Sequence, residues 1–354
     1  MPKLAVHLLG LVTLASVASY GASKAVTAGG VLSLTNSHVR LELNAADFSL
    51  RQLTDLGSGV QYVKEPGGAL FLVKGLVPGE RPVVWYVSAP GVDVSPQDFV
   101  RREAKTFSTP DGGAGWILSF AGAPLGDGKL SVQVSVSLPD DSPLLAWRIE
   151  VTNDSTTSLQ DVIFPTLSGL ASSREGSDVS DYIAAPLFSG ARYDHPRSET
   201  CAAQGQTEYP SSGMSIQLLS YCDGQGGTLY FASHDGDNYR KTLVATPMPS
   251  KSAFSERIVH YPGLSAGPGT WRLPYPVMWG PIKGDWYDAA KVYRRWAITQ
   301  PRWRRSLAER TDIPAWFPRL AVWFQGNAWS EEPEAIGELA DRIVRMREKL
   351  GHDF

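Results

Sequence analysis

The stretch Ser131-Val-Gln-Val-Ser-Val136 decides the fold class, because polar and apolar residues alternate strictly along it. Successive side chains of a β-strand point to opposite faces, so this pattern predicts a strand with one packed and one wetter face. The same alternation occurs over residues 39–43 and 147–151. Turn sequences separate these runs: Pro110-Asp-Gly-Gly113, Asp127-Gly128, Pro139-Asp-Asp141 and Asp223-Gly224. Residues 31–280 are therefore predicted to form a large antiparallel β-sandwich, with a hairpin between residues 215–221 and 228–233.

The composition argues for a globular protein that does not bind nucleic acid. The chain has 354 residues, a net charge of -3, 19% charged residues, 34 Gly and 25 Pro. This length allows one large domain or two ordinary ones with a sizeable core. A nucleic-acid-binding protein needs a basic surface that displaces counterions, and the charge balance argues against one.

The N-terminus has the features of an export signal. Lys3 precedes a mostly apolar run over residues 4–17, and Ser16-Val-Ala18 supplies small residues for cleavage. The run is shorter than the ~20 residues that span a bilayer. We predict a signal peptide over residues 1–25, a secreted or periplasmic protein, and no membrane span after cleavage. An uncleaved anchor and a misassigned start are the alternatives.

The chain has two cysteines, Cys201 and Cys222. In an oxidising compartment they can form one disulfide that closes the loop between them. Two buried thiols are an equally simple interpretation, because spacing alone does not place two Cα atoms at bridging distance. No CxxC motif or paired histidine spacing occurs, so we expect neither a metal nor another cofactor.

The pattern changes near residue 284. Asp285 can cap a helix over residues 284–300, with Trp286, Ala289, Tyr293 and Trp296 on its apolar face. A linker with two prolines leads to Arg319-Leu-Ala-Val-Trp-Phe-Gln325, which is typical of a strand buried on both faces of a parallel sheet. A second amphipathic helix follows, with Pro333 near its start and Gly351 after its end.

One βα unit cannot bury such a strand, and a (β/α)₈ barrel needs roughly 250 residues. The predicted domains are therefore a β-supersandwich over 26–283, a linker helix and linker over 284–318, and the first βα unit of an incomplete barrel over 319–354. The alternative is that the last helix docks on the sandwich.

Four stretches resemble the DUF6259 group of glycoside-hydrolase-like bacterial proteins: residues 209–214, 226–235, 284–297 and 312–316. The resemblance covers about residues 31–354. It implies a supersandwich similar to the galactose-mutarotase type, followed by a (β/α)₈ barrel, and carbohydrate as the substrate. It also implies that the catalytic acidic residues lie on later barrel strands, so no catalytic residue is assigned in this chain.

Barrel enzymes bind their substrates at the C-terminal ends of the strands. Gln325, Asn327 and Trp329 follow the predicted strand, so they are candidates for hydrogen bonding to a sugar or stacking on it. Tyr193 and His195 lie in segment 171–213, which lacks a clear pattern and which we interpret as a long surface excursion. Long loops often carry binding residues, so these two are also candidates for sugar contact.

Residues 234–238 are interpreted as a hairpin turn, because they fail the calcium-loop pattern. Trp271, Tyr275, Trp279 and Trp286 could form a carbohydrate platform, but sandwich cores also use large aromatic residues, so we expect most of them in the core and one or two exposed.

Three functions remain open at this point. The first is the N-terminal part of an exported glycoside hydrolase that acts on poly- or oligosaccharide. The second is a non-catalytic glycan-binding or structural module. The third is a mutarotase-like epimerase, whose acid and base would come from His195 and His234 with Glu208 or Glu256.

Overall fold

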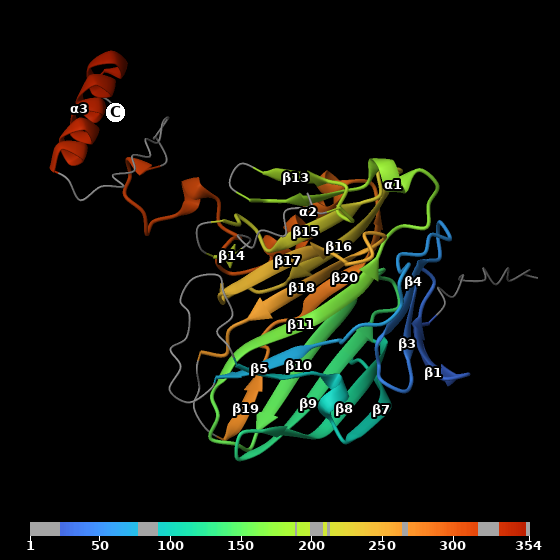
Figure 1. The fold of residues 1–354 in the computed structure, drawn as a ribbon. Coiled ribbons are helices and arrows are strands. Elements are labelled where there is room, and N and C mark those ends of the chain that lie inside the picture. The colour runs from blue at the N-terminus through green and yellow to red at the C-terminus, as the bar shows by residue number, and fades with distance from the viewer. Residues whose placement is uncertain are drawn as a thin grey trace, which may run out of the picture. The chain divides into compact units, whose positions relative to one another are not determined.

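The predicted antiparallel β architecture is confirmed by a computed structural model, which describes residues 22–76, 91–187, 190–198, 208–210, 213–263, 268–317 and 333–351. The described chain divides into two compact units, Met1–Trp296 and Ala297–Phe354. The first unit holds the three sheets labelled in Figure 1, and every strand pair in them is antiparallel.

The largest sheet has ten strands. Its order is β13 (Ala191–Asp194), β12 (Tyr182–Ala185), β15 (Leu218–Cys222), β16 (Gly227–Ser233), β20 (Val277–Lys283), β10 (Leu145–Asn153), β9 (Gly128–Leu138), β8 (Ala114–Leu125) and β7 (Arg101–Ser108), with β19 (Gly269–Arg272) paired to β10. The quoted stretch lies in β9, where Val132, Val134 and Val136 are buried. The predicted hairpin is β15–β16, which pairs Leu218 with Ala232 through Cys222 with Thr228.

A six-stranded sheet packs on the ten-stranded one. It runs β14 (Glu208–Tyr209), β17 (Lys241–Pro247), β18 (Phe254–His260), β11 (Leu159–Leu170), β5 (Leu72–Leu76) and β6 (Gly91–Val94). Ring contacts cross the interface: Trp147 meets Phe164 at 6.4 Å between centroids, and Tyr221 meets Phe254 at 4.7 Å. These contacts make the sandwich.

A four-stranded sheet completes the first unit: β1 (Lys24–Ala28), β2 (Val31–Thr35), β3 (Val39–Asn44) and β4 (Leu50–Asp55). The Trp116 indole of β8 donates a hydrogen bond to the Ser33 carbonyl of β2, and Phe48 meets Phe120 at 5.3 Å. The apolar residues of this four-stranded sheet belong to the same continuous core as those of the other two sheets.

The helices are α1 (Ser177–Ser180), α2 (Trp286–Ala297) and α3 (Pro333–Leu350), with short 3₁₀ turns at Pro96–Asp98 and Leu307–Glu309. Asp285 caps α2 as predicted, since its Oδ1 accepts the Tyr287 amide at 2.8 Å. Gly351 follows α3 with φ +94° and donates to the Arg347 carbonyl, as the C′ residue should. No described helix is both long enough and apolar enough to cross a bilayer.

Three predictions need correction. Segment 171–213 is more than a surface excursion, because β12 joins the ten-stranded sheet beside β15; its four residues are too few to reveal a period. Residues 234–238 do not form a hairpin turn, because β16 and β17 belong to different sheets. Trp286, expected to pack with the apolar face of α2, is instead 50% exposed. Ala289 and Tyr293 are the buried residues of that helix.

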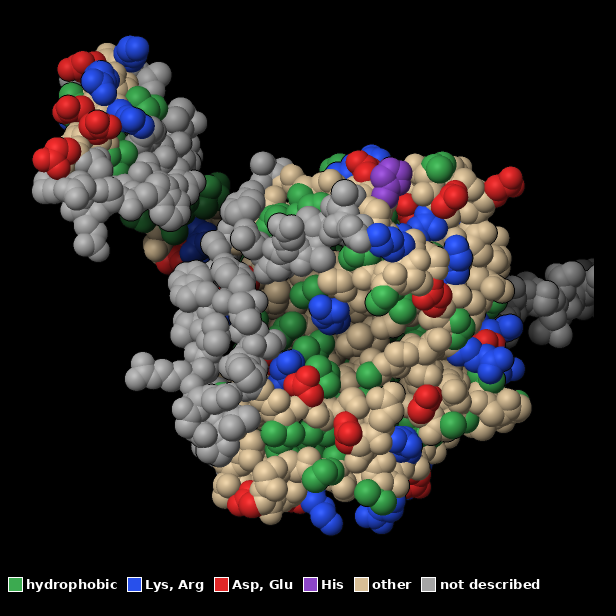
Figure 2. Space-filling model, viewed as in Figure 1, with side chains coloured by type: hydrophobic (Ala, Val, Ile, Leu, Met, Phe, Trp, Pro, Cys, Tyr) green, Lys and Arg blue, Asp and Glu red, His purple; other side chains and the backbone are tan. Residues whose placement is uncertain are grey.

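Several predictions fall outside the described residues. They concern residues 1–21 of the signal peptide, the strand over 319–325, and the loop residues Gln325, Asn327 and Trp329. Cys201 also lies there. Cys222 is buried and accepts a 3.4 Å hydrogen bond from Thr228 Oγ1. Because Cys201 is not described, the disulfide between them remains a prediction. On the face that Figure 2 shows, the described acidic and basic side chains are interspersed.

Candidate functional site

A pocket of about 320 Å³ lies where the last residues of β18 approach β19. We call it the aromatic pocket. It is lined by Tyr239, Arg240, His260, Tyr261, Pro262, Trp271, Arg272, Leu273, Pro274 and Tyr275. None of these described lining residues is acidic.

Four rings follow one another along one wall of the aromatic pocket. The centroid distances are 6.4 Å from Trp271 to His260, 5.7 Å from His260 to Tyr275 and 6.1 Å from Tyr275 to Tyr239. Tyr239 is 50% exposed, whereas Tyr275 is buried. A ligand in the pocket therefore reaches chiefly the rings of Tyr239 and Trp271, while the buried His260 and Tyr275 hold them in place. Such a wall suits a ligand with apolar and hydroxylated surfaces.

Two arginines at the pocket are held by carboxylates outside it. Arg240 donates to Glu208 Oε1 at 2.5 Å and lies 4.6 Å above the ring of Tyr261. Arg272 donates through Nε to Glu150, which stands directly opposite it in the β10–β19 register. Both arginine side chains are also exposed, 49% for Arg240 and 70% for Arg272, so the pocket rim presents hydrogen-bond donors that these charge-assisted contacts orient.

His260 is fixed in one tautomer. Its Nε2 lies 2.7 Å from the Phe164 carbonyl, which can only accept, so Nε2 carries the proton. Its Nδ1 therefore accepts the hydroxyl proton of Tyr275 at 2.9 Å. Burial lowers the pKa of His260 to about 3. Both ring nitrogens are occupied, so His260 shapes the wall and is not available as a general acid or base.

The buried ion pair of Lys241 and Asp235 packs behind the Tyr275 ring of the aromatic pocket. Lys241 Nζ donates to Asp235 Oδ2 at 2.6 Å and to Gln217 Oε1 at 2.8 Å, and lies 4.5 Å from the centre of the Tyr275 ring. Burial lowers the pKa of Lys241 to about 8, although Asp235 opposes the shift. Asp235 Oδ2 also accepts the Tyr239 amide, which ties the exposed ring of the wall to the core.

A second pocket of about 510 Å³ lies between β12, β13, β15 and α2. We call it the apolar pocket, because most of its lining is Ala, Pro, Ile or Leu, with Tyr182, Arg192 and Trp286 added. The predicted contact residue Tyr193 is not in this lining. Residues alternate along β13, so Arg192 faces the apolar pocket while Tyr193 packs against the core. His195 follows β13 at φ +55°, and its amide donates to the Asp181 carbonyl.

The four residues suggested for an epimerase do not form one cleft. Glu208 pairs with Thr242 and Glu256 with Ala245, which are three residues apart on β17, so the two carboxylates lie on opposite faces of the sheet. His195 follows β13 and His234 follows β16, strands three spacings or about 14 Å apart. The His234 ring is stacked on Trp296 of α2 at 4.4 Å, and burial lowers its pKa to about 4.

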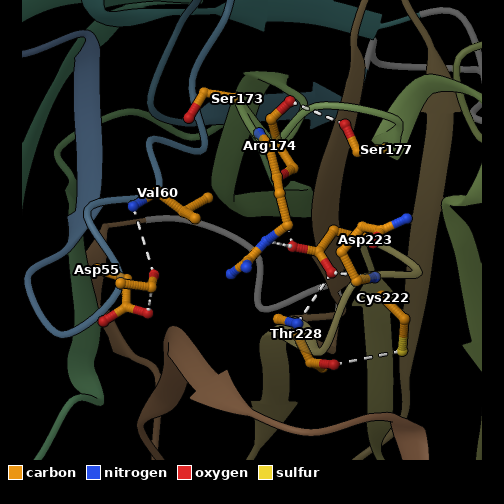
Figure 3. Close-up of polar contacts among 12 residues, drawn as sticks. Asp55, Val60, Ser173, Arg174, Ser177, Cys222, Asp223 and Thr228 are labelled. Atoms are coloured by element: carbon orange, nitrogen blue, oxygen red, sulfur yellow. Dashed lines mark hydrogen bonds and ion pairs between the residues drawn. The ribbon is translucent and has the colours of Figure 1, made fainter.

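Apart from the two pockets, a polar cluster surrounds Asp223 in the β15–β16 turn (Figure 3). Arg174 Nε donates to Asp223 Oδ2 at 3.0 Å, and the amides of Gln225 and Gly227 donate to Oδ1 at 2.8 and 2.9 Å. A Cβ on Gly227 would come within 2.6 Å of Asp223 Oδ2 and of the Tyr62 hydroxyl, so only glycine fits there. The cluster closes the hairpin and anchors the loop after β11, which is a structural role.

Among the residues that the structure describes, no group of three or more His, Cys, Asp and Glu side chains could hold a metal ion. Trp271 and Tyr275 were among the aromatic residues predicted as a possible carbohydrate platform, whereas His260, Arg240 and Arg272 were not predicted. No local pattern distinguishes these residues, because the pocket forms only when β18 and β19 come together.

Residues 271–354 match the family described as Domain of unknown function (DUF6259). This match confirms the resemblance to the DUF6259 group. The matched segment begins at Trp271, in the wall of the aromatic pocket, and extends through α2 and α3.

One curated relative is "Putative glycoside hydrolase 22789" of Monosiga brevicollis, 32% identical over 151 residues, which are 40% of this chain and 12% of the relative. The solved α-N-acetylgalactosaminidase NagBb of Bifidobacterium bifidum, in complex with GalNAc, is similar in fold: 13% identity, TM-score 0.61, 90% of this chain and 50% of that one. A galactose mutarotase-like protein from Lactobacillus casei also matches, at 13% identity and a TM-score of 0.38, over 72% of this chain and the whole of that one. The chain thus spans about an eighth of its curated relative and half of NagBb.

Proposed function

We propose that this chain is the sugar-binding sandwich at the N-terminal end of an exported glycoside hydrolase, and that the aromatic pocket holds one sugar unit of a poly- or oligosaccharide. The observation that carries the proposal is the four-ring wall of Trp271, His260, Tyr275 and Tyr239 beside two arginines paired with carboxylates. A sugar ring has apolar C–H faces that stack on aromatic rings and hydroxyls that accept from fixed N–H donors.

The chain binds sugar in this proposal but does not cleave it. Glycoside hydrolysis uses two carboxylates about 5–9.5 Å apart across the scissile bond. Neither the aromatic nor the apolar pocket has an Asp or Glu in its described lining. The catalytic pair then belongs to a (β/α)₈ barrel that starts with residues 319–325, where Gln325, Asn327 and Trp329 would contact the substrate.

The similarity to a glycoside-hydrolase-named relative supports this class of function, and the NagBb structure suggests GalNAc-containing oligosaccharides among the first probes. Export is proposed from the apolar run at residues 4–17. Accumulation of the chain in the medium or periplasm, lost on deletion of residues 2–18, would support export.

The binding test uses two aromatic side chains that are equally exposed. Tyr239 and Trp286 are each 50% exposed, the first in the aromatic pocket and the second in the apolar pocket. Tyr239→Ala is expected to weaken oligosaccharide binding about tenfold, which corresponds to about 1.4 kcal/mol of lost stacking. Trp286→Ala is expected to bind like the parent chain. Isothermal titration calorimetry against a panel of neutral oligosaccharides measures both.

Equal binding by Tyr239→Ala and the parent would show that the aromatic pocket is not the sugar site. Hydrolysis of aryl glycosides by this chain alone would contradict the placement of the catalytic pair. A longer chain that includes the barrel and binds sugar without turnover would instead identify a non-catalytic glycan-binding module.

A further inference from the structure

The apolar pocket has a chemistry different from that of the aromatic pocket. Its apolar walls are made by Ala184 and Ala185 of β12 with Pro186 after it, by Leu218 of β15 with Ile216 before it, and by Ala290 of α2. At about 510 Å³ it has the size of pockets that hold drug-sized ligands. Such a lining favours a bulky apolar group over a hydroxylated sugar ring.

One cation faces this apolar lining. The Arg192 guanidinium lies 3.9 Å above the Tyr182 ring, and Tyr182 and Arg192 both line the pocket. Arg192 donates through Nε to Asp194 Oδ1 at 2.7 Å, and its Nη atoms have no hydrogen-bond partner among the described residues. The ring and Asp194 thus orient the guanidinium while its outer edge stays able to bind a carboxylate or sulfonate in a forked geometry.

The strand register explains why these groups meet. Ala184 stands between Arg192 on β13 and Ser220 on β15, so all three side chains share the face of the ten-stranded sheet that α2 covers. Trp286, in the first turn of α2, closes the opposite wall with half of its surface still exposed. No Asp or Glu belongs to the described lining, and the one carboxylate at the guanidinium, Asp194, occupies its Nε edge and leaves the Nη edge for an anion.

We propose that the apolar pocket binds an amphipathic organic acid, an aryl or acyl group that carries one carboxylate or sulfonate, independently of sugar in the aromatic pocket. In a protein that processes glycans, such a group is the acid-bearing aglycone or acyl substituent of a glycoconjugate. This second site stands whether or not the aromatic pocket binds sugar.

Two dyes with the same ring skeleton test the proposal. 1-Anilinonaphthalene-8-sulfonate carries a sulfonate, and N-phenyl-1-naphthylamine lacks it. The parent chain should bind both, the sulfonate more tightly, with energy transfer from Trp286 that Trp286→Phe reduces. Arg192→Gln should weaken the sulfonate dye about tenfold and the neutral dye less than twofold, because only the former uses the guanidinium.

Ala184→Asp places a carboxylate in the middle of the pocket and should weaken both dyes at least tenfold. Tyr239→Ala, in the other pocket, should leave dye binding unchanged, and near-ultraviolet circular dichroism checks that each variant is folded. Equal loss of both dyes in Arg192→Gln, or no loss in Ala184→Asp, would overturn the proposal. Oligosaccharide titration of Arg192→Gln separates this outcome from failure of the sugar site, which that substitution should not affect.

Discussion

Replacing Asp223 by alanine is expected to lower the free energy of unfolding by about 3–5 kcal/mol. The carboxylate is fully buried and accepts from Arg174 (Figure 3). It also accepts from the Gln225 and Gly227 amides. Alanine leaves the buried Gly227 amide and the guanidinium without their acceptor. It also releases the loop after β11 from the β15–β16 hairpin. Urea unfolding followed by tryptophan fluorescence measures the loss.

Arg174→Gln is the matched control for that substitution. Its side chain is partly exposed, so losing the ion pair while keeping both amide contacts should cost only about 1 kcal/mol. Equal losses for the two variants would mean that the ion pair, and not the amide contacts, closes the turn. A loss below about 1 kcal/mol for Asp223→Ala would contradict the structural role altogether.

Replacing Glu256 by methionine is expected to stabilise the protein by about 2–4 kcal/mol at pH 8. Glu256 is fully buried on the core face of β18, and neither carboxyl oxygen has a hydrogen-bond partner among the described residues. Burial raises the pKa of Glu256 to about 8. The unpaired carboxyl is therefore a cost that an apolar side chain of similar length removes.

The sign of the pH dependence follows from that raised pKa. The folded protein keeps the Glu256 proton up to about pH 8, while the unfolded chain loses it above about pH 4.5. The folded state binds more protons between these values, so the parent loses stability as pH rises from about 4.5 to 8. The advantage of Glu256→Met should grow across this window and level off above it.

Glu256→Gln removes the ionisation while keeping a polar side chain. The Gln variant should therefore lack the parent's loss of stability between pH 4.5 and 8. It should be less stable than Glu256→Met, because its buried amide also lacks partners. Glu103→Gln, at an exposed carboxyl of β7, should leave the pH profile of unfolding unchanged. A Glu256→Met profile parallel to that of the parent between pH 4.5 and 8 would refute the assignment.

Parts of the candidate sites could be anticipated from local sequence. Of Trp271, Tyr275, Trp279 and Trp286, one or two were expected to be exposed, and Trp286 is the exposed one. Tyr193 shows the limit of that reasoning. It was chosen for its loop-like surroundings, but β13 turns it towards the core and presents Arg192 instead. A shift of one position along a strand exchanges the two faces, and only the pairing of β12 with β13 sets which face is outside.

The sequence alone determined the antiparallel β class, the regularly alternating strands with the turns between them, and both long helices. These depend on periodicity, caps and turn residues within a few positions of one another, as in β9, at Asp223-Gly224 and at Asp285. Only the tertiary structure decided that β16 and β17 belong to different sheets, and that Tyr239, His260 and Trp271 share one wall. Such contacts join residues far apart in the chain, and their geometry depends on sheet order and register, which local patterns do not encode.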